Sequence, residues 1–211
     1  MTSEGDRAAA GPLEPEDQAR ADFYALLARL YAAAPDAPLL AAIAAAGPLG
    51  GDAGAEDVEG IAAAWDSLRV ASAQADPAAV AVEYQALFIG VGKSEISLYA
   101  THYLGPQSGR PLAEMRAALA ALGLARRPAQ SEYEDHLSVV LETMRMLIAG
   151  DADRPPESIA AQKAFCERHL LPWVFDCCSA ITQNSVAKFY QHVASYARCF
   201  LAIERDSFAI E

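Results

Sequence analysis

The sequence predicts an all-α protein, a single globular helical domain of roughly eight to ten helices. Apolar residues recur at the i, i+3, i+4, i+7 spacing of a helical face along most of the chain, and no alternating run of β-branched residues indicates a strand. Asp, Pro and Gly residues divide this pattern where helices start and stop. We expect residues 1–13 to form a disordered N-terminal segment and residues 14–211 to form the domain.

Apolar stripes and their flanking residues predict four helices in the first 90 residues. The first helix ends before Pro35, and Asp36 can cap a short Ala-rich helix after it. A third helix surrounds Trp65. Asp76, which is followed by proline, marks the start of a fourth helix, and Gly90 stops it.

The second half begins with residues 91–110, which lack a helical stripe and carry Gly and Pro at both ends. A loop of this length is often functional, although a short helix over 96–104 is an alternative. Pro111 opens the next helix, which Gly123 closes. Four further helices are expected over 131–149, 159–171, 173–182 and 185–207.

Composition excludes several classes of function. A net charge of -12 and a pI near 4.7 argue against nucleic-acid binding, which needs clustered Lys and Arg. The N-terminus lacks a secretory signal pattern, and no stretch reaches roughly 18 uninterrupted apolar residues. We therefore expect a cytoplasmic protein without stable membrane insertion.

The cysteines favour buried free thiols, because they form no C-x-x-C pair. Cys166 and His169 lie three residues apart on one helical face and could give zinc two ligands. A structural zinc site needs four, and no other residues are spaced to complete it. We expect no metal site and no cofactor.

The run SEYEDH at residues 131–136 places three carboxylates and a histidine at a predicted helix start. Ser131 and Glu134 match a capping box. On a helical wheel Asp135 lies opposite Leu137, on an outer face that also holds Val139, Glu142 and Met146. This half-apolar face either packs under another segment or offers a binding surface. His136 falls between the two faces and is either hydrogen-bonded locally or acts as a general base or ligand.

Known catalytic motifs are missing from the sequence. The chain has no H-E-x-x-H, G-x-S-x-G or G-x-x-x-x-G-K-[ST]. All-α di-iron proteins need Glu-x-x-His on two helices, whereas this chain has Glu132 four residues before His136 and no second copy. A binding protein is therefore favoured over an enzyme.

Three stretches in combination resemble a known family: EYQALFIG at 83–90, the following SLYATHYL, and EYEDH at 132–136. They are similar to the TorD/DmsD family of cytoplasmic chaperones for molybdenum enzymes, and the likeness extends from about residue 23 to residue 208. Two positions depart from the family pattern. Tyr133 stands where the family usually has proline, and the loop lacks a proline near 96–98.

The resemblance implies a non-enzymatic chaperone that binds the twin-arginine signal peptide of the apo form of a molybdopterin oxidoreductase catalytic subunit. It would hold this client in the cytoplasm until cofactor insertion is complete, as a monomer or homodimer. The loop is most similar to members that accompany formate dehydrogenases. The peptide-binding residues that we expect are Asp135, His136, Glu132, Ser97, Tyr99, Tyr103, Tyr84, Phe88, Val139 and Met146.

Within this set the expectations differ. Tyr84, Leu87 and Phe88 share a helical stripe, which favours a place in the core over ligand contact. Asp135 would bind the arginines, since a carboxylate beside an apolar groove suits such a signal.

Two other classes of function remain open. In an all-α enzyme or small-ligand sensor, Asp135 and His136 would act as an acid–base pair. In a purely structural subunit, the face of Val139 and Met146 would join a larger complex.

Overall fold

The computed structural model describes residues 13–49, 56–90, 94–105, 109–124, 132–151 and 154–210, with side chains in the third helix from residue 60 onward. These ranges contain ten α-helices and one π-helical turn, and their only strand-like features are two isolated β-bridges. The helices are α1 (Pro15–Ala32), α2 (Ala37–Ala45), α3 (Glu56–Gln74), α4 (Pro77–Tyr84), α5 (Ala100–Leu104), α6 (Arg110–Ala121), α7 (Leu137–Ala149), α8 (Ile159–His169), α9 (Leu171–Gln183) and α10 (Tyr190–Ile210), and the π-helical turn η1 (Gln85–Ile89) follows α4. The prediction of an all-α fold is confirmed.

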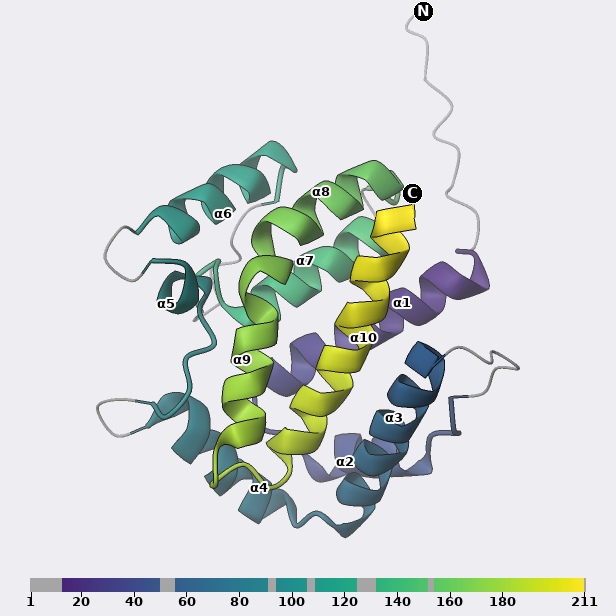
Figure 1. Ribbon diagram of the computed structural model, residues 1–211, viewed down its shortest axis with the longest axis vertical. Coiled ribbons are helices and arrows are strands. Elements are labelled where there is room, and N and C mark those ends of the chain that lie inside the picture. Colours follow the sequence, from purple (N-terminus) through teal and green to yellow (C-terminus); the bar gives the residue numbers. More distant parts are fainter. Residues whose placement is uncertain are drawn as a thin grey trace, which may run out of the picture.

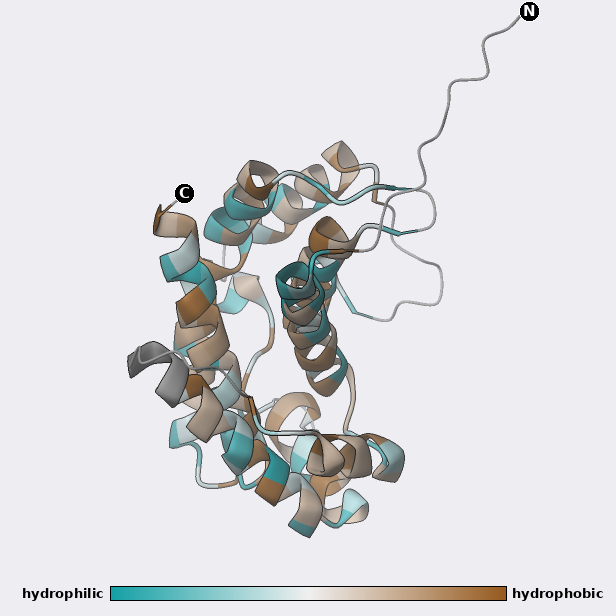
Figure 2. Cartoon of the chain, turned by 90° about the vertical axis from the view of Figure 1, so that its right-hand side faces the viewer, coloured by the Kyte–Doolittle hydropathy of each residue, from teal (hydrophilic) through white to brown (hydrophobic). Residues whose placement is uncertain are grey.

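The helices pack around one hydrophobic core. α1 packs mainly on α7, and α10 packs between α9 and α3 (Figure 1). α7 is the most enclosed helix near the site, since even Thr143 in its middle is only 3% exposed. Brown apolar and teal polar stretches lie side by side on the long helices in Figure 2, as expected for amphipathic helices around a core. Among the described residues, no helix combines the length and apolar character that a membrane span requires.

Several local signals are confirmed. The Asp36 carboxylate accepts the Leu39 N–H at 2.9 Å, and Asp76 accepts the Ala78 N–H at 3.1 Å. Gly90 ends η1 with φ near 65°, a conformation that other residues rarely adopt. The four cysteines are free thiols, and all except Cys199 are buried.

The starts of two helices were predicted wrongly. α7 begins at Leu137 and not at residue 131, and Ser131 with its expected cap lies outside the described residues, as do residues 1–12, 91–93 and 106–108. α10 begins at Tyr190 and not at 185. The carboxylate of Glu83 accepts the backbone N–H groups of Lys188, Phe189 and Tyr190 at 2.8–3.0 Å, so a residue more than 100 positions away caps this start.

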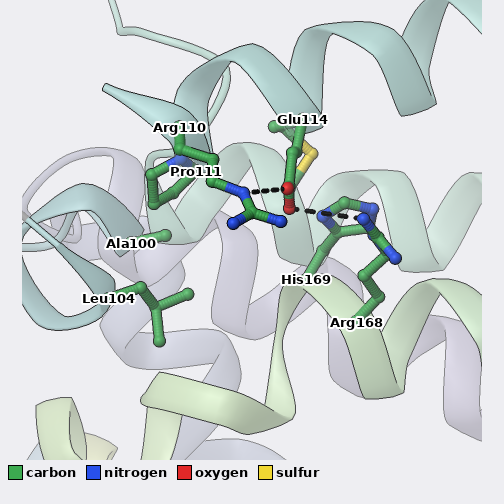
Figure 3. A pocket seen from close by; sticks show the side chains of 8 residues that line it. Ala100, Leu104, Arg110, Pro111, Glu114, Arg168 and His169 are labelled. Carbon is green, nitrogen blue, oxygen red and sulfur yellow. Dashed lines mark hydrogen bonds and ion pairs between the residues drawn. The ribbon is translucent and has the colours of Figure 1, made fainter. Parts of the chain in front are cut away.

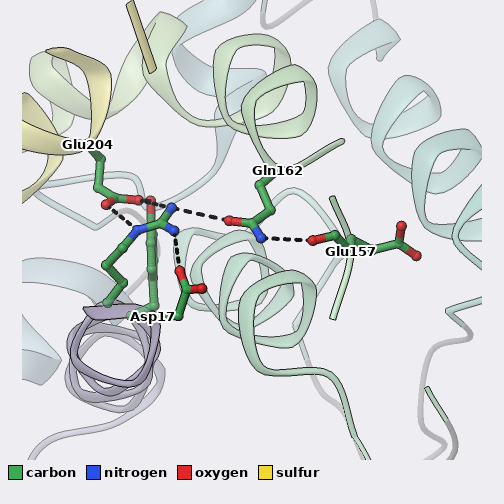
Figure 4. Close-up of polar contacts among 6 residues, drawn as sticks. Asp17, Glu157, Gln162 and Glu204 are labelled. Atoms are coloured by element: carbon green, nitrogen blue, oxygen red, sulfur yellow. Dashed lines mark hydrogen bonds and ion pairs between the residues drawn. The ribbon is translucent and has the colours of Figure 1, made fainter. Parts of the chain in front are cut away.

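A buried polar network joins α1, α8 and α10 (Figure 4). Arg20 donates from Nε and Nη2 to the two carboxylate oxygens of Glu204 at 2.7 and 3.0 Å, and the Tyr24 hydroxyl adds a bond at 3.1 Å. Arg20 also bonds Asp17 at 2.8 Å and Gln162 at 3.2 Å. Because Glu204 is only 4% exposed, its charge is balanced almost entirely within the protein.

Candidate functional site

The loop before α5 is fixed against the start of α7 by backbone hydrogen bonds. The Leu137 N–H donates to the Leu98 carbonyl at 2.8 Å, and the Ala100 N–H donates to the Asp135 carbonyl at 3.0 Å. Tyr99 and His136 face each other in an antiparallel bridge between these bonds. Two segments that the sequence analysis selected separately are therefore brought together.

We had expected Asp135 to lie on an outer helical face. It does not, because α7 starts only after it. The side chain is 2% exposed. Its Oδ2 accepts the Thr101 N–H at 3.0 Å and the Thr101 hydroxyl at 2.6 Å. Since the α5 N-cap, Tyr99, gives no side-chain cap of its own, Asp135 supplies the capping oxygen from another part of the chain.

His136 is the N-cap residue of α7. Its Nδ1 accepts the Ser138 N–H at 3.2 Å and lies 2.8 Å from the Ser138 hydroxyl, and the residue is 5% exposed. Burial lowers the pKa of His136, although the carboxylates of Glu132 and Asp135 oppose the shift. The local hydrogen-bonded role, one of the two that the sequence left open, is the one observed.

Tyr99, Glu132 and Tyr133 form a partly exposed group beside this joint, which we call the tyrosine–glutamate surface. The Tyr99 hydroxyl donates to Glu132, and the Tyr99 and Tyr133 rings lie 6.4 Å apart. Burial and the hydrogen bond to Glu132 raise the pKa of Tyr99 well above its usual range, so the phenol stays a donor. Tyr133 is 54% exposed, which makes it the most accessible of the three. The surface thus offers a carboxylate bonded to one aromatic side chain and next in sequence to another.

Ser97 and Tyr103 stabilise the loop that carries Tyr99. The Tyr103 hydroxyl donates to the Ser97 carbonyl at 2.9 Å, and its ring stacks on Trp173 with centroids 5.5 Å apart. Ser97 Oγ accepts the Tyr99 N–H at 3.3 Å. Both residues are half-buried, so they shape the loop and keep some access to solvent.

Tyr84 and Phe88 lie in the core, as the helical stripe predicted. Tyr84 is 6% exposed and donates to the carbonyls of Tyr31 and Ala32 at 3.2 and 3.0 Å. Phe88 is 9% exposed and packs edge-on against Tyr84 at 5.2 Å. Burial, with a smaller effect of the Glu132 carboxylate, raises the pKa of Tyr84 to about 12.

Val139 and Met146 are half-buried on α7. Met146 lines a narrow gap at the end of α6, beside Leu122 and Arg154. Seven residues of helix separate Val139 from Met146, a rise of about 10 Å. A groove that extends from the tyrosine–glutamate surface along both residues therefore stays a prediction.

Cys166 and His169 point to different surroundings. Cys166 Sγ lies 4.0 Å from the Tyr24 hydroxyl, whereas His169 lines a pocket near α6. In the part of the chain that the structure describes, no group of three or more His, Cys, Asp or Glu residues is arranged to hold a metal.

Three residues that contribute to the site were not predicted from the sequence. Thr101 binds Asp135, Trp173 stacks on Tyr103, and Tyr133 exposes its ring. Only Tyr133 gave a signal, because an aromatic residue replaces the proline of the resembling family at that position. The other two contacts depend on tertiary packing between distant segments.

Comparisons with known proteins agree with this architecture. The family model described as nitrate reductase delta subunit matches residues 55–179, more than half of the 211 residues. A solved structure from Archaeoglobus fulgidus, described as a candidate redox enzyme maturation protein, superposes with a TM-score of 0.52 at 17% identity. That match covers 94% of this chain and 98% of the other, so the fold is shared over most of the chain.

Two curated relatives are named chaperone protein TorD. The protein from Psychrobacter sp. (strain PRwf-1) is 30% identical over 117 residues, which is 53% of each chain. The protein from Vibrio cholerae serotype O1 is 27% identical over 139 residues, 63% of this chain and 62% of the relative. The matched parts thus span less than two thirds of either relative.

Proposed function

Because the chain belongs to the nitrate reductase delta subunit family, the family of TorD, we propose that it is a maturation chaperone for a molybdopterin oxidoreductase. In this role it binds the twin-arginine signal peptide at the N-terminus of the apo catalytic subunit. It keeps the client in the cytoplasm until the cofactor is inserted, and it performs no catalysis. A formate dehydrogenase is the first client to test, and the chaperone acts as a monomer or homodimer.

The tyrosine–glutamate surface is the observation that carries the proposed binding mode. Glu132 can accept a guanidinium, and the rings of Tyr99 and Tyr133 can stack on its flat face. A charge-assisted hydrogen bond contributes about 1.5–3 kcal/mol, or roughly ten- to hundredfold in affinity. Glu132 therefore replaces Asp135 as the proposed arginine acceptor, since Asp135 is only 2% exposed whereas Glu132 is half-buried.

Asp135 and His136 have a positioning role in this proposal. Asp135 holds α5, and His136 starts α7, so together they fix the relative placement of Tyr99 and Glu132. Because the loop is already ordered, less conformational entropy is lost when the peptide binds. Ser97 and Tyr103 keep the loop in shape from the opposite side.

The test is isothermal titration of the full chain with synthetic twin-arginine signal peptides from molybdopterin oxidoreductases. We expect one peptide to bind. The same peptide with both arginines changed to alanine should bind at least about tenfold more weakly. Glu132→Gln should weaken the native peptide by a similar factor. Glu167→Gln, an exposed change of the same kind on α8, is the matched control and should bind as the wild type does.

Two results would contradict the binding mode. Equal affinity for the alanine peptide would mean that the apolar stretch of the signal is recognised without its arginines. An unchanged affinity of Glu132→Gln, with intact arginine dependence, would move the arginine site elsewhere on the chain.

An acid–base enzyme receives less support. Asp135 is bonded to Thr101 and His136 to Ser138, and both side chains are almost fully buried. A general base has to reach its substrate directly or through one water. The two residues are therefore better suited to hold the loop than to transfer protons.

A further inference from the structure

A pocket of about 190 Å³ lies between α5, α6 and α8 (Figure 3), and none of the residues proposed above to bind the peptide lines it. Figure 3 shows the small apolar residues Ala100, Leu104 and Pro111 on one side of the pocket. Glu114, Arg168 and His169 lie on the other side, and the Arg110 side chain extends toward Glu114 between the two. The pocket therefore combines a polar wall and an apolar wall in a small volume.

The polar wall has an excess of positive charge. Arg110 Nε lies 2.7 Å from Glu114 Oε1, and Arg168 Nη2 lies 3.5 Å from Glu114 Oε2. The second distance is longer than a normal hydrogen bond, so Glu114 engages Arg168 only weakly. Two arginines and one glutamate give the lining a net formal charge of +1, in a chain whose total is -12.

His169 is the second, independent indication of a ligand. It is only 7% exposed, yet within the described ranges no hydrogen bond reaches its ring. Its backbone carbonyl accepts the Trp173 indole N–H at 2.8 Å, which fixes the residue at the end of α8. Buried polar groups almost always have a partner, and here the open direction is the pocket, where Figure 3 shows the ring beside Glu114 and Arg168.

We propose that this pocket binds a monocarboxylate with a short apolar chain. Arg168 and the N–H of His169 hold the carboxylate, and the hydrocarbon part lies toward Ala100, Leu104 and Pro111. A single carboxylate fits beside Arg168, whereas a dianion would add repulsion from Glu114. At about 30 Å³ per water molecule, the pocket has room for roughly six water-sized groups, about the size of butyrate.

The two walls also separate the proposed ligand from other oxyanions. Phosphate and sulfate expose polar oxygens on all sides, so they would leave oxygens unsatisfied against the apolar wall. A short monocarboxylate has one polar and one apolar end, which matches the arrangement of the lining. The site does not depend on the proposed peptide surface, and either proposal can fail alone.

The experiment is an NMR titration of the full chain with sodium butyrate at constant ionic strength, following the ring signals of His169. Those of His192 on α10 serve as the internal reference. We expect saturable shifts of the His169 signals and weaker or no saturation with phosphate. Arg168→Gln should weaken butyrate binding about tenfold, whereas Glu114→Gln should tighten it several-fold, because the competing carboxylate is removed.

Arg29→Gln is the matched control. The Arg29 side chain is 59% exposed and 3.4 Å from Asp36, close to the 63% and 3.5 Å of Arg168 and Glu114. The Arg29→Gln variant should bind butyrate as tightly as the wild type does. The proposal is overturned if His169 shows no saturable shift, if phosphate binds as tightly as butyrate, if Arg29→Gln weakens binding as much as Arg168→Gln, or if Glu114→Gln weakens it.

Discussion

The polar network around Glu204 and the tyrosine–glutamate surface around Glu132 both join distant segments through a carboxylate. Glu204 is 4% exposed and accepts two hydrogen bonds from Arg20 and a third from Tyr24. Glu132 is half-buried and is bonded by the Tyr99 phenol, beside an exposed Tyr133. The sealed carboxylate is bound by a cation of its own chain, whereas the half-buried one lies at the surface where we propose that an arginine of the signal peptide binds.

This comparison predicts that the largest loss of stability follows from opening the sealed network. Arg20→Met leaves the Glu204 charge buried without its cation, and we expect about 3–5 kcal/mol of destabilisation in urea unfolding. Arg29→Met on the same helix breaks an exposed pair with Asp36 and should cost less than about 1 kcal/mol. Similar losses for both variants would show that the network is no more than a surface ion pair.

A smaller effect is expected where the buried carboxylate has neutral donors. Asp135→Ala leaves the capped end of α5 without its acceptor and should destabilise the fold by about 1–3 kcal/mol. Thr101→Val should cost less, since the backbone N–H of residue 101 can still bond Asp135. In a double-mutant cycle the two changes should be less than additive, and additive losses would mean that they act independently.

The smallest effect concerns pH. Burial lowers the pKa of His136 in the folded state, so the unfolded chain binds a proton there more readily. The stability from neutral His136 is complete above about pH 6.5 and decreases as the pH falls below that value. Urea unfolding at pH 7.5 and 5.5 should show a smaller difference for His136→Gln than for the wild type. An unchanged difference would contradict this, and His102→Gln on the exposed side of α5 is the control.

The sequence predicted most helices because their signals are local. Apolar stripes, the caps at Asp36 and Asp76, and the stops at Gly90 and Gly123 act within a few residues. The errors lie where a distant group satisfies a helix end. Glu83 caps α10, and the pairing of residues 98–100 with 135–137 delays the start of α7 to Leu137.

The candidate site was predicted only in part, for the same reason. The motif residues Tyr99, Glu132 and Asp135 do meet, but the helical wheel placed Asp135 on an outer face because it assumed a helix that begins at residue 131. Its partner Thr101 is 34 residues away in the sequence, and a local sequence pattern does not predict contacts between such distant residues. The sequence singled out one residue of the pocket beside α6, His169, but as a possible zinc ligand with Cys166. Arg168 and Glu114 gave no signal, since they are charged residues like many on a helix surface.

The packing of α1 on α7 affects how the chain folds during its synthesis. The two helices are separated by more than 100 residues, so α1 leaves the ribosome long before its main partner exists. Its buried residues, among them Leu27 and Leu30, stay without that partner until α7 emerges. Such long-range contacts slow folding, because a long loop has to close before they form. α1 thus reaches its final place only after α7 has been synthesised.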